Sequence, residues 1–195
     1  MKVAFRRGET TQYAVHIHRP DGVVVSLPGA GGRWPIPHDL AHFATERALG
    51  MAGGIFGSMA SGAMFPGMSV VSGRLRHDPK RRSKDVLRVN EKARTIAVAE
   101  VMASLVHECV QHGAHRADLL DRARAAWGIV REDPFPYTAE QLRAAVEDLR
   151  TLSERWARTR VGQALEVDWP DGLVTQLSRP AGRPKPPGSR RRTRA

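Results

Sequence analysis

Alternating apolar and polar residues near both ends of the chain predict β-strands. Residues 15–27 combine this alternation with a Pro-Asp-Gly triplet and a second apolar run, a combination typical of a β-hairpin. Residues 164–177 repeat the pattern around a second Pro-Asp-Gly triplet. A further strand at residues 3–7 is expected beside the first hairpin. The two chain ends are therefore predicted to form one antiparallel sheet with one apolar face.

The middle of the chain shows the three- and four-residue apolar spacing of amphipathic helices. The clearest example starts at Thr138, which forms a capping-box pattern with Gln141 ahead of a long apolar stripe. Four to five helices are expected, over residues 37–49, 54–61, 91–113, 119–127 and 138–156. Strands at both ends with helices between them predict an α+β fold, in which a layer of helices covers one face of the sheet.

Length and charge divide the chain into a body and a tail. A chain of 195 residues with 41% hydrophobic content suits one globular domain, expected over residues 1–178. The net charge of +11 is concentrated in two places. Residues 74–88 hold seven bases and two acids, and residues 179–195 hold seven bases and no acid. The body is otherwise nearly neutral, and the Pro-, Gly- and Arg-rich residues 179–195 are predicted to be a disordered basic tail.

Three features bear on the compartment. The first twelve residues contain no apolar core typical of a signal peptide. Residues 48–65 are the least polar stretch, but they are crowded with Gly, Ser and Ala, which favours a closely packed element over a membrane span. The single cysteine, Cys109, excludes an internal disulfide and is expected to be a buried thiol. A cytoplasmic protein without a membrane span is therefore expected.

The segment PHDLAHFATE, residues 37–46, carries the most suggestive chemistry. At about 100° per residue, His38, His42 and Glu46 share one side of the expected helix, with Asp39 beside them. Two imidazoles four residues apart on a helix can bind one divalent metal ion, and zinc is the first metal to consider. The string also matches the zincin pattern H-E-x-x-H with Asp in place of Glu. The hypothesis assigns His38, His42 and Glu46 as ligands. Asp39, one methylene shorter than the zincin Glu, is assigned either as a general base or as a residue that supports the ligands. The alternative is an ordinary solvated helix face.

A second group of metal-ligand residue types lies near the end of the expected helix 91–113. Glu108, His112 and His115 follow one another at helical spacing and flank the apolar stripe. Two helices that each supply His and carboxylate side chains are how metal sites in helical bundles are built, so this flank is a second source for the third ligand. The alternative is the polar end of an amphipathic helix, where histidine interacts favourably with the helix dipole.

The two basic segments support a hypothesis from a different class, non-specific binding of nucleic acid or another anionic polymer. Such binding would depend steeply on salt concentration. Neither segment contains interleaved aromatic residues for base stacking, so no sequence specificity is expected. The alternative is a solubilising tail and a charged loop. The candidate contacts are Arg74, Arg76, Lys80, Arg81, Arg82, Arg190, Arg191 and Arg192.

One part of the chain resembles a known group of sequences. Residues 37–65, PHDLAHFATERALGMAGGIFGSMASGAMF, and residues 70–78, VVSGRLRHD, resemble a group of uncharacterised bacterial, mainly actinobacterial, proteins. Members of that group show a PHDLxH segment followed by a GxFG-like segment. The resemblance covers about a third of the chain and implies no activity. It does imply that the segment with His38, Asp39 and His42 is a family signature.

Overall fold

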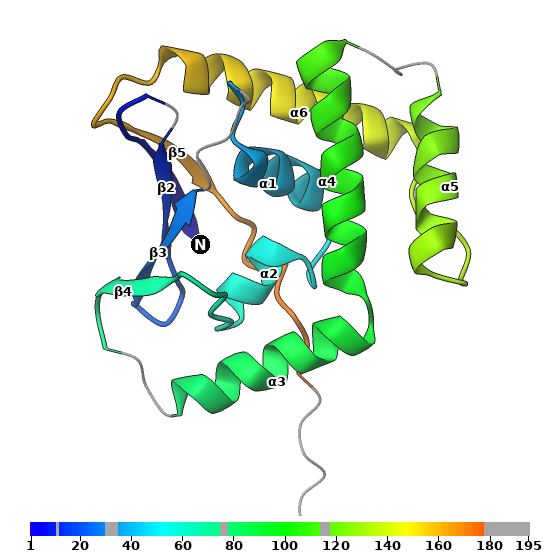
Figure 1. Cartoon of the computed structure of the whole chain (residues 1–195). Coiled ribbons are helices and arrows are strands. Elements are labelled where there is room, and N and C mark those ends of the chain that lie inside the picture. The colour runs from blue at the N-terminus through cyan, green and yellow to red at the C-terminus, as the bar shows by residue number, and fades with distance from the viewer. Residues whose placement is uncertain (11, 30–34, 75–77, 114–117, 178–195) are drawn as a thin grey trace, which may run out of the picture.

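The computed structural model describes residues 1–10, 12–29, 35–74, 78–113 and 118–177. Within these residues the predicted α+β class is confirmed by a five-stranded antiparallel sheet and six helices (Figure 1). The strands follow the order β4-β3-β2-β1-β5 across the sheet. Their bounds are β1 (Lys2–Arg7), β2 (Tyr13–His18), β3 (Val24–Gly29), β4 (Ser69–Ser72) and β5 (Ala164–Asp168). The first and last strands in sequence thus lie side by side.

The alternation in sequence becomes one buried and one exposed face of the sheet. In the register of β1 and β2, Val3 pairs with Ile17 and Phe5 pairs with Val15, and all four side chains are fully buried. His18 and the carboxylates of β5 lie on the opposite, outer face. The apolar face therefore packs against the helices, as the two-residue period requires.

The predicted second hairpin is wrong, because the chain leaves the sheet after β5. Trp169 is almost fully buried among aromatic rings, and its indole N–H donates to the carbonyl of Leu173 at 2.8 Å. Further on, Thr175 N–H donates to Ser61 Oγ at 2.7 Å, and Thr175 Oγ1 accepts from Asn90 at 2.9 Å. A second strand would have paired Thr175 within the sheet. Its N–H and hydroxyl groups are instead bound by Ser61 and Asn90, which belong to the helical part of the chain. Strand β4, which was not predicted, pairs with β3 and forms one edge of the sheet.

The predicted helices are present, with bounds α1 (His38–Ala48), α2 (Ile55–Ala60), α4 (Thr95–His112), α5 (Leu119–Val130) and α6 (Ala139–Arg158). The capping box of Thr138 and Gln141 is confirmed at the start of α6. The interpretation of the basic segment as a charged loop is wrong, because most of it forms α3 (Pro79–Lys92). Asp78 caps this helix by accepting from Arg81 N–H at 3.1 Å, and Pro79 suits the first helical turn.

Helix α1 is the centre of the fold. Figure 1 shows it between the sheet and α4, with α6 crossing its other side. Phe43 is fully buried and packs edge-to-face on Phe5 of the sheet and on Phe56 of α2. Arg47 binds Asp148 of α6 through both carboxylate oxygens, at 2.6 and 2.8 Å. Because α1 is surrounded, any polar side chain along its middle needs a partner within the protein.

No described helix combines the length and the apolar character needed to cross a bilayer. Residues 48–65, the least polar stretch, instead contribute the end of α1, a turn and the short helix α2. Cys109 lies buried in the core, as expected from its position on the apolar stripe of α4.

Candidate metal centre

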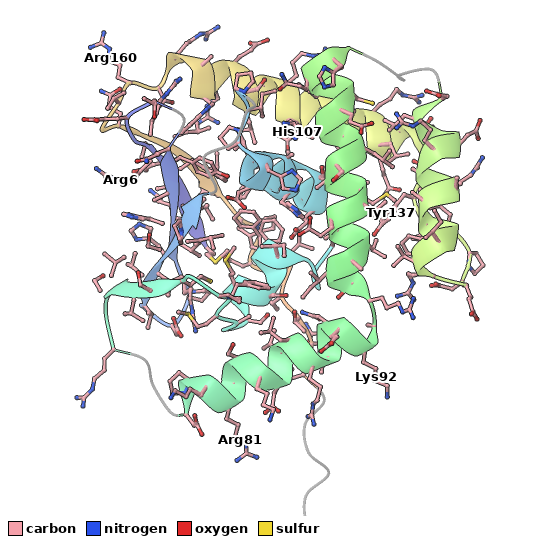
Figure 2. The ribbon with its side chains drawn as sticks, in the orientation of Figure 1. Arg6, Arg81, Lys92, His107, Tyr137 and Arg160 are labelled. Carbon is pink, nitrogen blue, oxygen red and sulfur yellow. The ribbon has the colours of Figure 1, made fainter. Side chains whose placement is uncertain are left out.

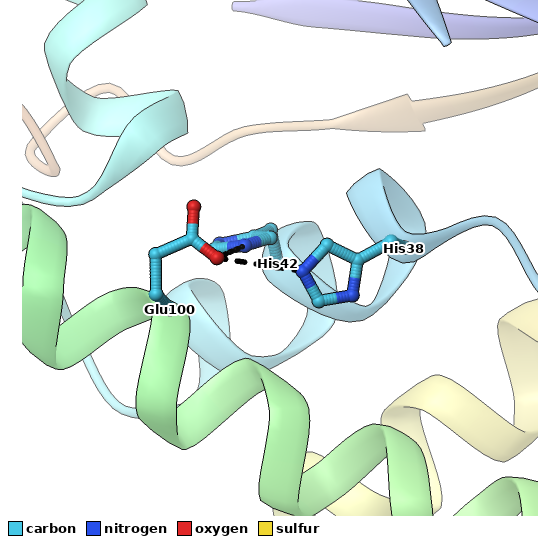
Figure 3. Close-up of side chains that lie close together, drawn as sticks. All are labelled: His38, His42 and Glu100. Carbon is cyan, nitrogen blue, oxygen red and sulfur yellow. Dashed lines mark hydrogen bonds and ion pairs between the residues drawn. The ribbon is translucent and has the colours of Figure 1, made fainter. Parts of the chain in front are cut away.

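Three metal-ligand side chains from two helices converge where α1 packs against α4. His38 and His42 lie one turn apart on α1, and Glu100 lies in the second turn of α4 (Figure 3). Oε2 of Glu100 is 3.2 Å from Nε2 of His42 and 3.5 Å from Nε2 of His38. The ligand atoms of the three residues all lie within 4.8 Å of one another. We call these three residues the His-His-Glu cluster.

The two separations from the Glu100 carboxylate suit ligands of one small cation, and the imidazole nitrogens of the two histidines lie within 4.8 Å of each other. Zinc binds His nitrogen and carboxylate oxygen at about 2.0–2.2 Å with tetrahedral angles, which places neighbouring ligand atoms about 3.3 Å apart. The two distances to Glu100 lie on either side of that value. The rings of His38 and His42 are nearly perpendicular, with centroids 4.8 Å apart, so they do not stack face to face. The donor set of two nitrogens and one oxygen is compatible with zinc and with other divalent first-row metals.

Glu46, which the sequence predicted as the third metal ligand, lies outside the group formed by His38, His42 and Glu100, so its role as a ligand stays a prediction. Its fully buried carboxylate accepts from Nδ1–H of His42 at 3.0 Å and from the backbone N–H groups of Ile55 and Phe56, each at 2.9 Å. The carboxylate therefore binds the first N–H groups of α2, which have no partner within that helix. It also holds the ring of His42 so that Nε2 faces Glu100. Glu46 lies on the predicted side of α1 and holds the ring of His42, while Glu100 is the carboxylate that faces both histidines.

The cluster is buried at one end and open at the other. The side chain of His42 is 2% exposed, whereas those of His38 and Glu100 are 44% and 52% exposed. Burial lowers the pKa of His42, but the hydrogen bonds and charges of Glu100 and Glu46 outweigh burial and raise it to about 10. The hydrogen bonds from His38 and His42 in turn hold the pKa of Glu100 well below its usual range. These pKa shifts favour a protonated His42 between the carboxylates of Glu46 and Glu100.

Asp39, the predicted general base, is directed elsewhere. Its Oδ2 accepts from the Tyr13 hydroxyl at 2.6 Å, which ties the start of α1 to β2. Burial and then the charge of Asp39 raise the pKa of Tyr13 well above its usual range. Among the described residues, no hydrogen bond or ion pair joins Asp39 to His38, His42 or Glu100. A catalytic role for Asp39 therefore stays a prediction.

A further histidine borders the cluster. His107 lies two turns after Glu100 on α4, and Figure 2 shows it on the part of α4 that α6 crosses. Its ring centroid is 5.7 Å from that of His38. The residue is 8% exposed, and its Nε2 has no hydrogen-bond partner within the described part of the chain. Burial, and then the charge of His38, lower the pKa of His107, so the structure favours a neutral ring here.

The second predicted source of ligands does not reach the cluster. Glu108 is bound to Arg122 of α5 at 2.8 Å. His112 lies at the C-terminal end of α4, and His115 lies outside the described residues. That this helix supplies a ligand stays a prediction. Among the described residues, the side chain of α4 that lies in the cluster is that of Glu100, two turns before Glu108. A sequence signal existed, since Glu100 is the one charged residue between positions 95 and 106.

The predicted anion-binding residues fall into three groups. Arg74, Lys80 and Arg81 are exposed. Arg82 is also exposed overall, but its guanidinium donates to the carbonyl of Ser61 at 2.8 Å and so helps attach α3 to α2. The others, Arg76, Arg190, Arg191 and Arg192, lie outside the described residues, as does the predicted tail 179–195.

Comparison with protein-family models, with curated proteins and with solved structures gives no match for this chain. The resemblance of its PHDLAH segment to a bacterial group therefore stays a prediction. Any functional conclusion rests on the geometry of the cluster.

Proposed function

We propose that the protein binds one divalent metal ion, zinc in the first instance, through His38, His42 and Glu100. The observation that carries the proposal is the arrangement around His42. One ring nitrogen is held by the buried carboxylate of Glu46, and the other faces His38 and Glu100. A carboxylate on the far nitrogen of a metal-bound histidine fixes the orientation of the ring and increases the basicity of the ligand nitrogen.

The exposure of the cluster favours a reactive site over a purely structural one. Structural zinc sites are closed by four protein ligands, whereas catalytic sites use three and keep one position for water or substrate. Here three side chains converge, and two of them face solvent. A divalent metal in such a site acts as a Lewis acid and activates bound water, which makes hydrolysis the reaction class we propose.

The test is the metal content of purified, untagged protein measured by elemental mass spectrometry. We expect about one equivalent of zinc, iron or manganese in the wild-type protein, and none in a His38→Ala/His42→Ala variant. The matched control is His16→Ala/His18→Ala, which removes two histidines from the outer face of β2. This control should keep its metal, and circular dichroism should show all three proteins folded.

The result that overturns the proposal is a wild-type protein that carries no metal and takes none up on dialysis against zinc, iron or manganese. The His-His-Glu cluster would then be an ion-paired group in which a protonated His42 lies between Glu46 and Glu100. Loss of metal from the control variant as strongly as from the cluster variant would also overturn it, because the binding would then be adventitious.

A second function, binding of an anionic polymer, is supported by the exposed basic residues of α3. Lys80, Arg81 and Lys84 all face solvent on this helix. We propose this as a separate activity that does not involve the metal. It predicts affinity for double-stranded DNA or heparin that falls steeply between about 50 and 200 mM salt. Binding that persists unchanged at high salt, or that is absent at low salt, would contradict it.

A further inference from the structure

Two neighbouring pockets follow helix α3. One, of about 690 Å³, lies between α3 and Met64. The other, of about 600 Å³, lies where the end of α3 meets the start of α4 and the end of α5. Leu87 and Glu91 line both pockets, and we call the first pocket, which Lys80 and Lys84 also line, the α3 groove. It is separate from the His-His-Glu cluster, none of whose residues lines either pocket.

The α3 groove combines an apolar floor with a cationic edge. Leu87 forms the middle of the floor, and the partly buried Met64 lies at one end. Lys80, Lys84 and Arg88 also line the first pocket. Their spacing of four residues places them along one edge of α3.

The charges on this edge are only partly neutralised by the protein itself. Arg88 pairs with Asp85 at 3.3 Å, but Lys80 and Lys84 form no ion pair with any other described residue. Glu91 is the carboxylate of the lining, and it lies seven residues beyond Lys84, or about 10 Å along the helix axis. The first pocket therefore combines apolar side chains with two lysines that no described carboxylate neutralises.

We propose that the α3 groove binds a single-chain anionic amphiphile, a long-chain carboxylate. The carboxylate lies against Lys80, Lys84 and Arg88, and the alkyl chain lies along Leu87 and Met64. A polyanion would use the same cations but gains nothing from the apolar floor. Residues 178–195 of the chain itself contain only basic charges, so they do not complement the cationic edge. The pocket volumes lie in the range of small-molecule sites.

The experiment uses dodecanoate below its micelle concentration as the probe, with binding followed by isothermal titration calorimetry on the full chain. We expect one equivalent to bind. Affinity should rise about two- to fourfold per methylene from octanoate to dodecanoate, as expected for a chain that is at least partly buried. Butyrate, which has the charge without the chain, and dodecyltrimethylammonium, which has the chain with the opposite charge, should bind at least tenfold more weakly.

Two charge reversals on α3 separate a local site from a general electrostatic effect. Lys84→Glu lies in the lining and should weaken dodecanoate binding at least tenfold. Arg81→Glu makes the same charge change on the same helix, but Arg81 lines neither pocket and projects from the outer side of α3 (Figure 2). It should change the affinity less than threefold. A third variant, Leu87→Ser, should weaken binding and flatten the dependence on chain length.

Four results would each overturn the proposal. These are no binding of dodecanoate, equal binding of the cationic amphiphile, affinity independent of chain length, and equal weakening by Arg81→Glu and Lys84→Glu. The last two would assign α3 to polyanion binding alone. Uptake of many equivalents with loss of the folded signal would mean a detergent effect only. The His38→Ala/His42→Ala variant should bind dodecanoate normally, which keeps this test independent of the metal.

Discussion

Replacing Glu46 by glutamine tests whether this residue orients a metal ligand, as the structure indicates, or binds the metal directly. Glutamine has nearly the same shape but only one acceptor oxygen. It must face three donors, namely Nδ1–H of His42 and the N–H groups of Ile55 and Phe56. Its own NH2 group then points at one of these donors, with no water available because Glu46 is fully buried.

The expected magnitudes follow from these contacts. A buried donor without an acceptor costs about 1–3 kcal/mol, and the cost lies at the upper end of this range where the lost partner is charged. We therefore expect Glu46→Gln to lower the free energy of unfolding by about 2–4 kcal/mol. Domains of this kind are stable by about 5–15 kcal/mol, so the variant should still fold. Loss of the orienting carboxylate should weaken zinc binding about 10- to 100-fold.

Two assays separate the roles of Glu46. Urea unfolding in the presence of a chelator measures stability, and competition with a chromogenic chelator measures the zinc dissociation constant. Glu147→Gln is the matched control, because Glu147 is exposed on α6 and its loss should change stability by less than about 0.5 kcal/mol. Zinc affinity within twofold of wild type in the folded variant would refute the orienting role. Complete loss of zinc stoichiometry would instead make Glu46 a direct ligand.

Three further predictions concern the surroundings of the cluster. Tyr13→Phe removes the hydroxyl bound to Asp39 and should destabilise the fold by about 1–2 kcal/mol without changing zinc affinity; a tenfold change in affinity would couple Asp39 to the metal. Gly54→Ala places a Cβ against the Glu46 carboxylate, so both thermal stability and zinc affinity should fall. A variant with unchanged stability and zinc affinity would show that the carboxylate can move freely. Because the pKa of His42 is raised from 6.5 to about 10, chelator-treated protein should lose stability as the pH rises between these two values. Zinc affinity should instead rise with pH, since zinc must displace the proton of His42. Unfolding curves and zinc titrations from pH 6 to pH 9 check both signs.

The parts of the fold that could be predicted depend on short-range patterns. Alternation along β1, β2 and β5 identified the strands and their buried faces, because side chains of a strand alternate whatever the strand packs against. The capping box of α6 was recognisable because its hydrogen bonds join residues three apart in sequence. The spacing of His38 and His42 likewise places both rings on one side of α1 through helical geometry alone.

Other features depend on contacts between distant segments. After β5 the Pro-Asp-Gly turn is a local signal for a hairpin, but burial of Trp169 against α1 and α2 directs the chain along the helices instead. Helix α3 was missed because its charged residues obscured a narrow buried stripe, Ser83, Val86 and Asn90, whose partners lie in other elements.

The candidate site shows the same division between sequence and tertiary structure. The sequence alone determined that two histidines and a glutamate lie on one side of α1. Only the tertiary structure decided that the N-terminus of α2 binds Glu46 and that Glu100, 62 positions after His38, completes the cluster. The physical reason is that a helix sets the directions of its own side chains, whereas the partner of each polar group depends on which other element packs against it.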